Sequence, residues 1–106
     1  MARDHNYFVY IAECADGLYY TGVTNNLDRR LYEHNEGIDP KCFTYSRRPV
    51  LLRYWLQFTD IKQAIAWEKQ IKGWGRKKKE ALFKENWEEI KVLAKNKQSQ
   101  SSTGSD

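Results

Sequence analysis

The sequence has few of the residues on which disulfide frameworks, cysteine-based metal sites and membrane spans depend. Its 106 residues include two cysteines, Cys14 and Cys42, whose spacing matches no metal site. We therefore expect two reduced thiols. No run approaches the ~20 apolar residues of a transmembrane helix, and no hydrophobic segment of signal-peptide type follows Met1. These absences predict a cytoplasmic protein without a membrane partner.

The apolar content is sufficient for one small domain. Apolar residues make up 41% of the chain, with four Trp, seven Tyr and four Phe, and a chain of this size forms a single core. From Lys95 onward Gln, Ser, Thr and Gly dominate. We predict a domain over residues 1–94 and a disordered polar tail over residues 95–106.

Positive charge is concentrated in two places, the stretch from Lys69 to Lys79 and the pair Arg47 and Arg48. The formal net charge is +4, and a stretch without acidic residues lies between Lys69 and Lys79. Such clusters favour a polyanion through counterion release, although a solvated helix face explains the stretch equally simply. The candidate DNA-binding residues are Arg47, Arg48, Lys72, Arg76, Lys77, Lys78 and Lys79.

The order of patterns predicts an α+β fold, a small antiparallel three-stranded sheet flanked by helices. Strands are expected over residues 7–12, 18–21 and 50–58, which are rich in aromatic and β-branched side chains. Helices are expected over residues 27–35, after Asn25 or Asn26, and from Thr59 or Asp60 to about Lys72. Further helices are expected over residues 77–83 and 87–93.

The turn between the first two strands decides whether Tyr10 and Tyr20 share a face. A two-residue turn at Asp16-Gly17 places the two rings on opposite faces. A three-residue loop, Ala15-Asp16-Gly17 with a left-handed glycine, places Tyr10 opposite Gly22 and both rings on one face. A glycine at the third position is typical of the second turn.

Two helices carry ionisable residues on the stripe that should face the core. At 100° per residue Arg30 and His34 share a stripe with Leu27 and Leu31, so their polar groups can converge on one ligand. Glu68 falls near the middle of the apolar face formed by Ile61, Ala64, Ile65 and Ile71. A buried carboxylate needs a cation or hydrogen bonds, and a metal ion or Arg30 would supply them.

Taken in order, these residues resemble the catalytic motifs of the GIY-YIG nuclease family. The motifs are Phe8-Val9-Tyr10, Tyr20-Thr21-Gly22, Arg30 with His34 four residues later, and Glu68. The resemblance covers roughly residues 7 to 83. It is closest to small stand-alone bacterial members and to the N-terminal domain of excinuclease C. It implies the GIY-YIG fold and a metal-dependent endonuclease that hydrolyses DNA, with a place in DNA repair.

The resemblance also implies a role for each residue. Glu68 would hold a single Mg²⁺ or Mn²⁺ ion, and Arg30 would stabilise charge in the transition state. Tyr10 would activate or orient water with His34 accepting its proton, and Tyr20 would hydrogen-bond the phosphate or the nucleophile. We expect these five residues to line one concave site that solvent reaches. Nicked or branched DNA, or a protein partner, are the expected partners of a monomer.

Three positions depart from the family pattern. Phe8 replaces a glycine, Thr21 stands in the middle of the second triplet, and Val23 replaces a lysine that some relatives use in proton transfer. The base role therefore passes to His34. Two other functions remain open: a nucleic-acid-binding module of the same fold without catalysis, and a protein-interaction adaptor presenting Trp55, Trp74 or Trp87.

Overall fold

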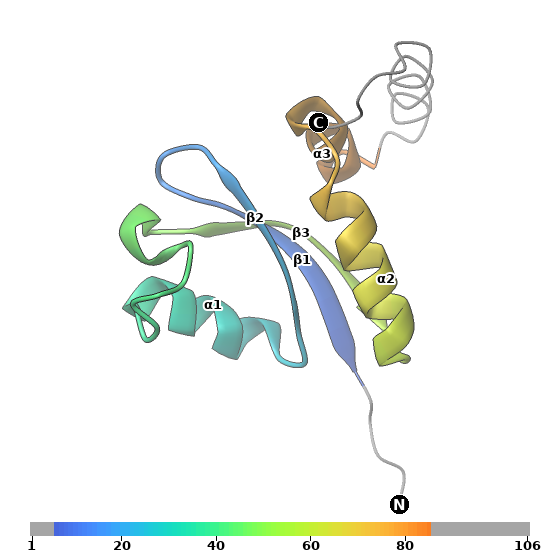
Figure 1. The fold of residues 1–106 in the computed structure, drawn as a ribbon, viewed down its shortest axis with the longest axis horizontal. Coiled ribbons are helices and arrows are strands. Elements are labelled where there is room, and N and C mark those ends of the chain that lie inside the picture. Colours follow the sequence, from blue (N-terminus) through green and yellow to red (C-terminus); the bar gives the residue numbers. More distant parts are fainter. Residues whose placement is uncertain (1–5, 86–106) are drawn as a thin grey trace, which may run out of the picture. The chain divides into compact units, whose positions relative to one another are not determined.

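The computed structural model describes residues 6–85. These residues form β1 (Tyr7–Glu13), β2 (Tyr19–Thr24), α1 (Leu27–Glu36), β3 (Leu51–Phe58), α2 (Ile61–Lys72) and α3 (Arg76–Phe83), as Figure 1 shows. A short 3₁₀-helix, Tyr45–Arg47, lies in the loop after α1. The expected α+β class is confirmed. The chain divides into two compact units, one up to Glu68 and one from Lys69, and each is described by itself.

The three strands form one antiparallel sheet in the order β2-β1-β3. Directly paired residues share a face, and Tyr10 pairs with Gly22 on β2 and Trp55 on β3. Ile11 pairs with Thr21 and Tyr54. We call the side of Tyr10 the tyrosine face and the side of Ile11 the opposite face. A register shift between Ile11 and Ala12 marks a bulge against β3.

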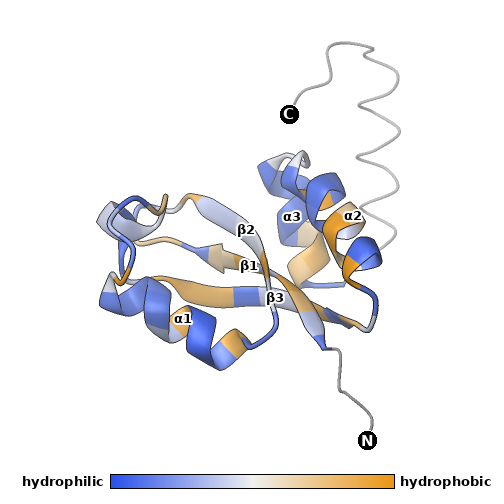
Figure 2. Cartoon of the chain, turned by 60° about the horizontal axis from the view of Figure 1, so that its bottom comes forward, coloured by the Kyte–Doolittle hydropathy of each residue, from blue (hydrophilic) through white to orange (hydrophobic). Residues whose placement is uncertain are grey.

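Helix α1 belongs to the tyrosine face. A core cluster there contains four buried residues and four partly buried ones, two of which come from α1: Tyr10, Ala12, Cys14, Val50, Tyr20, Leu27, Leu31 and Leu52. The outer side of α1 is strongly hydrophilic, as Figure 2 shows. The helix is therefore held by a narrow stripe of side chains.

Local sequence determines where α1 begins and ends. The Asn26 side chain accepts a hydrogen bond from the Arg29 backbone N–H at 3.0 Å, which stabilises the first turn. Gly37 adopts the left-handed conformation, with φ of 68°, and its N–H bonds back to the His34 carbonyl. This glycine cap ends the helix and starts the loop that passes beside the site.

Helix α2 begins at a cap and contacts the opposite face. The Asp60 carboxylate accepts from the Lys62 backbone N–H at 3.0 Å, which selects Asp60 over Thr59 as the cap. Trp67 Nε1 donates to the Tyr54 hydroxyl at 3.2 Å. Ala64 is fully buried, whereas Ile65 is 40% exposed. The expected apolar face was therefore wrong at Ile65 and at Ile61, which is 36% exposed, whereas the partly buried Trp67 bonds to the sheet.

The second unit contains the end of α2 and all of α3. Residues 73–75 break the helix as expected, and α3 begins directly after them. Ala81 and Leu82 are buried side chains of α3. The helix expected over residues 87–93 and the polar tail lie outside the described residues. No helix within residues 6–85 is long and apolar enough to span a membrane.

Candidate active site

The hairpin brings Tyr10 and Tyr20 onto one face. The Cys14 N–H bonds to the Leu18 carbonyl at 2.8 Å, and Gly17 has a φ of 89°, so the loop has three residues with a left-handed glycine. The ring centroids of Tyr10 and Tyr20 lie 6.2 Å apart. The expectation of a shared face is confirmed, and the two-residue turn is excluded.

Gly22 provides the space that the Tyr10 hydroxyl occupies. A Cβ atom at Gly22 would lie 2.7 Å from the Tyr10 Oη and 3.0 Å from Tyr20 Cε2. Real side chains do not approach so closely, so an alanine here would displace one of the two phenols. The third residue of the motif Tyr20-Thr21-Gly22 is thus a glycine for a steric reason that concerns both tyrosines.

Helix α1 directs Arg30 and His34 toward the tyrosines. His34 is buried, and Leu27, Arg30 and Leu31 are partly buried, whereas Arg29 is exposed. The expected stripe is confirmed. The Tyr10 hydroxyl lies 2.8 Å from His34 Nε2 in a buried hydrogen bond. The Tyr20 ring stands edge-on to the imidazole, with 5.1 Å between centroids.

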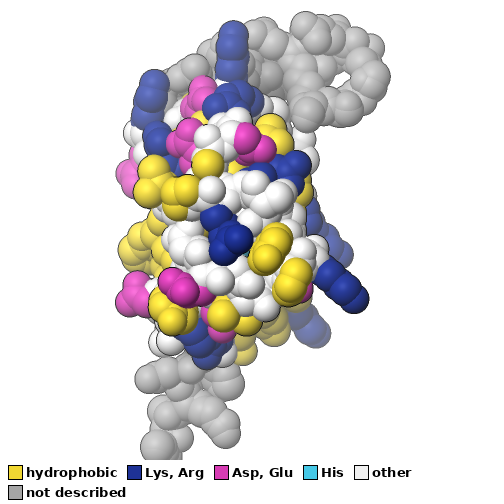
Figure 3. All heavy atoms as spheres, turned by 90° about the vertical axis from the view of Figure 1, so that its left-hand side faces the viewer, with side chains coloured by type: hydrophobic (Ala, Val, Ile, Leu, Met, Phe, Trp, Pro, Cys, Tyr) yellow, Lys and Arg dark blue, Asp and Glu magenta, His cyan; other side chains and the backbone are white. Residues whose placement is uncertain are grey.

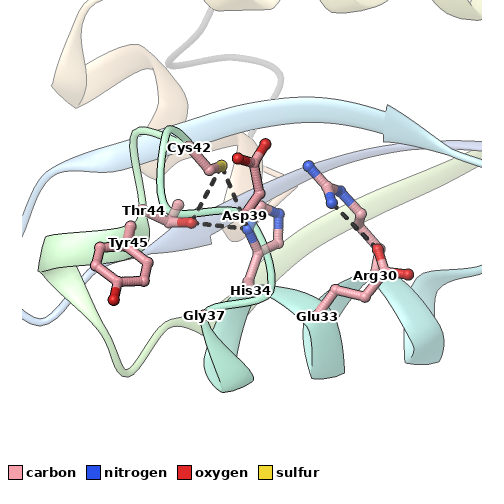
Figure 4. Close-up of a pocket in the computed structure, with 8 residues that line it drawn as sticks. All are labelled: Arg30, Glu33, His34, Gly37, Asp39, Cys42, Thr44 and Tyr45. Atoms are coloured by element: carbon pink, nitrogen blue, oxygen red, sulfur yellow. Dashed lines mark hydrogen bonds and ion pairs between the residues drawn. The ribbon is translucent and has the colours of Figure 1, made fainter.

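The other nitrogen of His34 also has a partner. His34 Nδ1 lies 2.8 Å from Thr44 Oγ1, and the Thr44 hydroxyl donates to Cys42 Sγ at 3.4 Å. Figure 4 shows Thr44 and Cys42 together on one side of the imidazole. Both cysteines in the described residues are free thiols, as expected. Thr44 and Cys42 were missed in the sequence, because the loop after Gly37 has no periodicity that fixes side-chain direction.

Burial and neighbouring charges shift the protonation of this cluster. Burial, supported by the charge of Arg30, lowers the pKa of His34 to about 4, so the imidazole is neutral at pH 7. Burial and the proximity of Tyr20 raise the pKa of Tyr10 above its ordinary value, against the effect of Arg30. The pair at pH 7 is a neutral phenol beside a neutral imidazole.

Arg30 is the cation of the site. Burial opposes its charge, but hydrogen bonds with Tyr10, Glu33 and Tyr20 leave its pKa raised. Its Nη1 lies 3.2 Å from Glu33 Oε1, a contact visible in Figure 4. A guanidinium held between two phenols and one carboxylate is permanently charged and remains partly open to solvent.

A pocket lies beside these groups, between α1 and the following loop. Its lining, drawn in Figure 4, consists of Arg30, Glu33, His34, Gly37, Asp39, Cys42, Thr44 and Tyr45. Tyr10 is only 1% exposed. The Tyr10 hydroxyl is enclosed over Gly22 and against His34. The expectation that the five residues line one site that solvent reaches stays a prediction.

Glu68 is half-buried near the end of the first unit. Its neighbour Trp67 bonds to the opposite face of the sheet. The inclusion of Glu68 in the site therefore stays a prediction. Within residues 6–85, no group of three or more His, Cys, Asp or Glu side chains is arranged to hold a metal ion.

The first unit carries two of the predicted DNA-binding residues. Arg47 Nε forms an ion pair with Asp16 at 3.0 Å, and its guanidinium lies 4.0 Å from the Phe43 ring centre. Exposed Arg48 lies over the Tyr45 ring at 4.5 Å. Figure 3 views the end of the molecule that contains this loop and shows basic side chains beside hydrophobic ones. Asp16 compensates the charge of Arg47, and Arg48 Nε donates to the Tyr45 carbonyl at 2.7 Å. A role of either residue in DNA binding stays a prediction.

The second unit carries the other five predicted DNA-binding residues, Lys72, Arg76, Lys77, Lys78 and Lys79. Arg76 forms an ion pair with Glu80 at 3.1 Å, and Lys78 Nζ lies 4.4 Å from the Trp74 ring centre. Lys72 and Lys77 are exposed, and Lys79 is partly buried. Cationic groups thus follow the start of α3 within this unit, and their role in DNA binding stays a prediction.

The fold and these four clustered residues define a class of protein. Residues 6–81 match the sequence profile of the GIY-YIG catalytic domain. The chain therefore belongs to the GIY-YIG family, a family of nuclease catalytic domains, and the resemblance seen in the sequence is confirmed.

The relatives, which are known from curated sequences or solved structures, are small proteins similar in length to this chain. A UPF0213 protein from Bacillus pumilus (strain SAFR-032) is 43% identical over 81 residues, 76% of this chain and 82% of the relative. One from Halobacterium salinarum is 47% identical over 75 residues, 71% of this chain and 96% of the relative. The protein EF2693 from E. faecalis, whose structure was determined by solution NMR, is 34% identical in sequence to this chain. The two structures match with a TM-score of 0.55 over 79% of this chain and 88% of that one. Their names state no activity.

Proposed function

We propose that the protein is a metal-dependent endonuclease that hydrolyses DNA phosphodiester bonds. The observation that carries this proposal is the buried hydrogen bond of 2.8 Å between Tyr10 and a neutral His34. Arg30 and Tyr20 lie directly beside this pair. A phenol, a proton acceptor and a fixed cation in one cluster are the groups that phosphodiester hydrolysis needs.

Tyr10 and His34 provide a route for the proton. The raised pKa of Tyr10 makes its phenolate costly, so Tyr10 activates water only if its own proton leaves at the same time. His34 is neutral and its Nε2 is within hydrogen-bond distance. The phenolic O–H bond breaks as the Nε2–H bond forms, and the phenolate takes a proton from the attacking water. The water oxygen bonds to phosphorus as the bond from phosphorus to the leaving oxygen breaks. Because the pKa of His34 is lowered to about 4, the imidazolium holds its extra proton only briefly and gives it to solvent.

Arg30 and Tyr20 act on the phosphate. Arg30 remains charged and partly exposed, so its guanidinium can bind the non-bridging oxygens as negative charge develops. Tyr20 is more exposed than Tyr10 and is placed to donate a hydrogen bond to the phosphate or to position the nucleophile.

Glu68 is the residue we assign to the divalent ion. Mg²⁺ prefers oxygen ligands and commonly binds one or two carboxylates together with several waters, and a single half-buried carboxylate fits that requirement. When bound, the ion would act as a Lewis acid toward the phosphate and the leaving oxygen. Mn²⁺ is the expected substitute.

The basic residues hold the DNA backbone in this proposal. The candidates are Arg47 and Arg48 in the first unit and Lys72, Arg76, Lys77, Lys78 and Lys79 in the second. The log of the binding constant should fall by roughly 0.7 to 0.9 per phosphate contact per decade of salt. Replacing Lys77, Lys78 and Lys79 by Gln should reduce that slope, and an unchanged slope would place the DNA elsewhere.

A cleavage assay tests the proposal. The full chain is incubated with single-stranded, duplex, nicked and branched DNA, with Mg²⁺, Mn²⁺ or EDTA, beside Glu68→Gln and, as a control carboxylate on the same unit, Glu36→Gln. We expect metal-dependent cleavage that Glu68→Gln abolishes and Glu36→Gln retains. Activity that persists in EDTA, or unchanged in folded Glu68→Gln, would contradict the metal assignment.

A non-catalytic nucleic-acid-binding module is the second candidate. The near-complete burial of Tyr10, which is 1% exposed, favours it, because a catalytic phenol must meet water or substrate. Salt-dependent DNA binding without cleavage of any substrate, with either metal, would select this reading. The adaptor has less support: Trp55 is 50% exposed, whereas Trp74 is 9% exposed and lies against Lys78.

A further inference from the structure

Thr44 has a buried hydroxyl group to which the proposed mechanism assigns no role. It lies in the loop after α1, is 1% exposed, and precedes the short 3₁₀-helix Tyr45–Arg47. Its Oγ1 is 2.8 Å from His34 Nδ1. Thr44 and Tyr10 thus bond the two nitrogens of one imidazole, and a neutral imidazole has one donor and one acceptor to offer them.

Cys42 is the third partner: its Sγ lies 3.4 Å from Thr44 Oγ1 and 3.9 Å from His34 Nδ1, so it accepts from the Thr44 hydroxyl and can share the Nδ1–H with Thr44. The Thr44 hydroxyl has one proton, and it donates that proton to Cys42 Sγ at 3.4 Å. Its oxygen is then free to accept from His34 Nδ1–H. The proton of the neutral imidazole is therefore on Nδ1, and Nε2 carries the lone pair that accepts from the Tyr10 hydroxyl.

We propose that Thr44, oriented by Cys42, is a positioning residue that holds His34 in the Nδ1–H tautomer needed to accept the proton of Tyr10. This inference rests on the proposed function. In the other tautomer Nε2–H would donate to the Tyr10 oxygen, and His34 would have no lone pair facing the phenol. Thr44 also accepts from Nδ1–H after the transfer, so the same contact supports the imidazolium.

The direct test is to determine which nitrogen of His34 carries the proton. The full chain is labelled with ¹⁵N-histidine in a His5→Gln background, so that His34 gives the single histidine signal, and nitrogen shifts and two-bond couplings are measured at pH 7. We compare wild type, Thr44→Val, Thr44→Ser and Ser46→Ala, an exposed hydroxyl of the same loop.

Wild type, Thr44→Ser and Ser46→Ala should show the Nδ1–H tautomer. Thr44→Val should shift the tautomer ratio toward Nε2–H by roughly 2- to 10-fold, which corresponds to the loss of one hydrogen bond of ~0.5 to 1.5 kcal/mol. An Nε2–H tautomer in wild type, or an unchanged ratio in Thr44→Val, would overturn the proposal. If Thr44→Val does not fold, Cys42→Ala replaces it: its ratio should move in the same direction, and an unchanged ratio would overturn the assigned direction of the bonds.

A cleavage assay on the same variants separates this inference from the proposed function. Thr44→Val should reduce the cleavage rate constant by about 10- to 100-fold, the range seen when the partner that orients a functional imidazole is removed, and Thr44→Ser should restore most of it. If wild type cleaves nothing, the proposed function fails while the tautomer ratio still tests Thr44. If wild type cleaves and folded Thr44→Val cleaves equally fast, the positioning role is overturned.

Discussion

Buried hydroxyl groups on the two faces of the sheet differ in their hydrogen bonding. On the tyrosine face, the buried Tyr10 hydroxyl bonds to His34, which bonds to Thr44, which bonds to Cys42. On the opposite face, the hydroxyl of Thr21 is buried, with 4% of the residue exposed, and has no hydrogen-bond partner within residues 6–85. Thr21 is paired directly with Ile11.

This difference distinguishes a connected polar cluster, which can take part in chemistry, from a single buried hydroxyl, which affects packing and stability. An isolated buried hydroxyl reduces stability, and the Thr21 hydroxyl is isolated among residues 6–85. A connected set of buried polar groups on the tyrosine face constrains protons and charges, and burial there lowers the pKa of His34 to about 4. Residues adjacent in the sequence, such as Tyr20 and Thr21, can therefore differ completely in what they contribute.

The largest expected effect concerns the charge beside the tyrosines. Arg30→Ala should lower the cleavage rate by ~10² to 10³, the typical cost of losing one electrostatic contact to the transition state, and should change DNA affinity far less. Arg29→Ala is the matched control, because Arg29 is exposed and bonds to Asn25. Single-turnover rates and binding measured on both folded variants give the comparison. Equal losses in the two variants would indicate a general effect of charge.

The second effect is the pH dependence of stability from His34. The folded state holds His34 neutral with a pKa of about 4, against an ordinary value of 6.5. Its contribution is fully present above pH ~6.5, and it is lost as the pH falls toward 4, because only the unfolded chain binds the proton there. At ~1.4 kcal/mol per pH unit, stability should fall by about 2 kcal/mol from pH 6.5 to 5.

Urea unfolding of wild type and His34→Gln at the two pH values isolates this contribution. His34→Gln should lose less stability on acidification, because every other ionisable group is present in both proteins. Parallel losses in the two proteins would show that His34 is not held neutral, and the tyrosine face would then lack its proton acceptor.

The third effect is steric. Gly22→Ala places a Cβ 2.7 Å from the Tyr10 oxygen, so it should destabilise the fold by about 1 to 3 kcal/mol and displace Tyr10 from His34. Gly73→Ala is the control, because the nearest atom to its Cβ is 3.8 Å away and it should be neutral or slightly stabilising. Thermal unfolding measures both. A Gly22→Ala variant as stable as wild type would show that the tyrosines are loosely packed.

The smallest expected effect is the change in stability when valine replaces a buried threonine, either Thr21 on the opposite face or Thr44 beside the tyrosine face. Thr21→Val removes an unpartnered hydroxyl and should stabilise by ~1 kcal/mol, which raises Tm by roughly 4 to 8 °C. Thr44→Val removes a bonded hydroxyl and should destabilise by ~1 to 3 kcal/mol. Calorimetry on the two variants gives both signs. Destabilisation by Thr21→Val would mean that its hydroxyl is satisfied after all.

Most of the tyrosine face could be predicted from the sequence, because short-range patterns determine it. Gly17 selected the three-residue loop that fixes the register of Tyr10 and Tyr20. Asn26 and the helical period fixed the direction of His34. Each of these features depends on a few neighbouring residues.

The remaining features depend on contacts between distant residues. Thr44 and Cys42 reach His34 from a loop without periodicity, and Asp16 pairs with Arg47 across two loops. Neither contact leaves a local pattern in the sequence. The apolar face of α2 was shifted because Trp67 bonds to Tyr54, a pairing that only the tertiary structure shows.

The central claim is that the phenol on the tyrosine face takes part in the reaction. Tyr10→Phe and Tyr54→Phe each remove one hydroxyl from the sheet, one from each face, and leave the ring in place. Metal-dependent cleavage by the two folded variants is the most direct measurement. The account predicts a loss of at least ~10²-fold for Tyr10→Phe, as for other proton-transfer groups, and a nearly unchanged rate for Tyr54→Phe. Equal rates for wild type and Tyr10→Phe would contradict it.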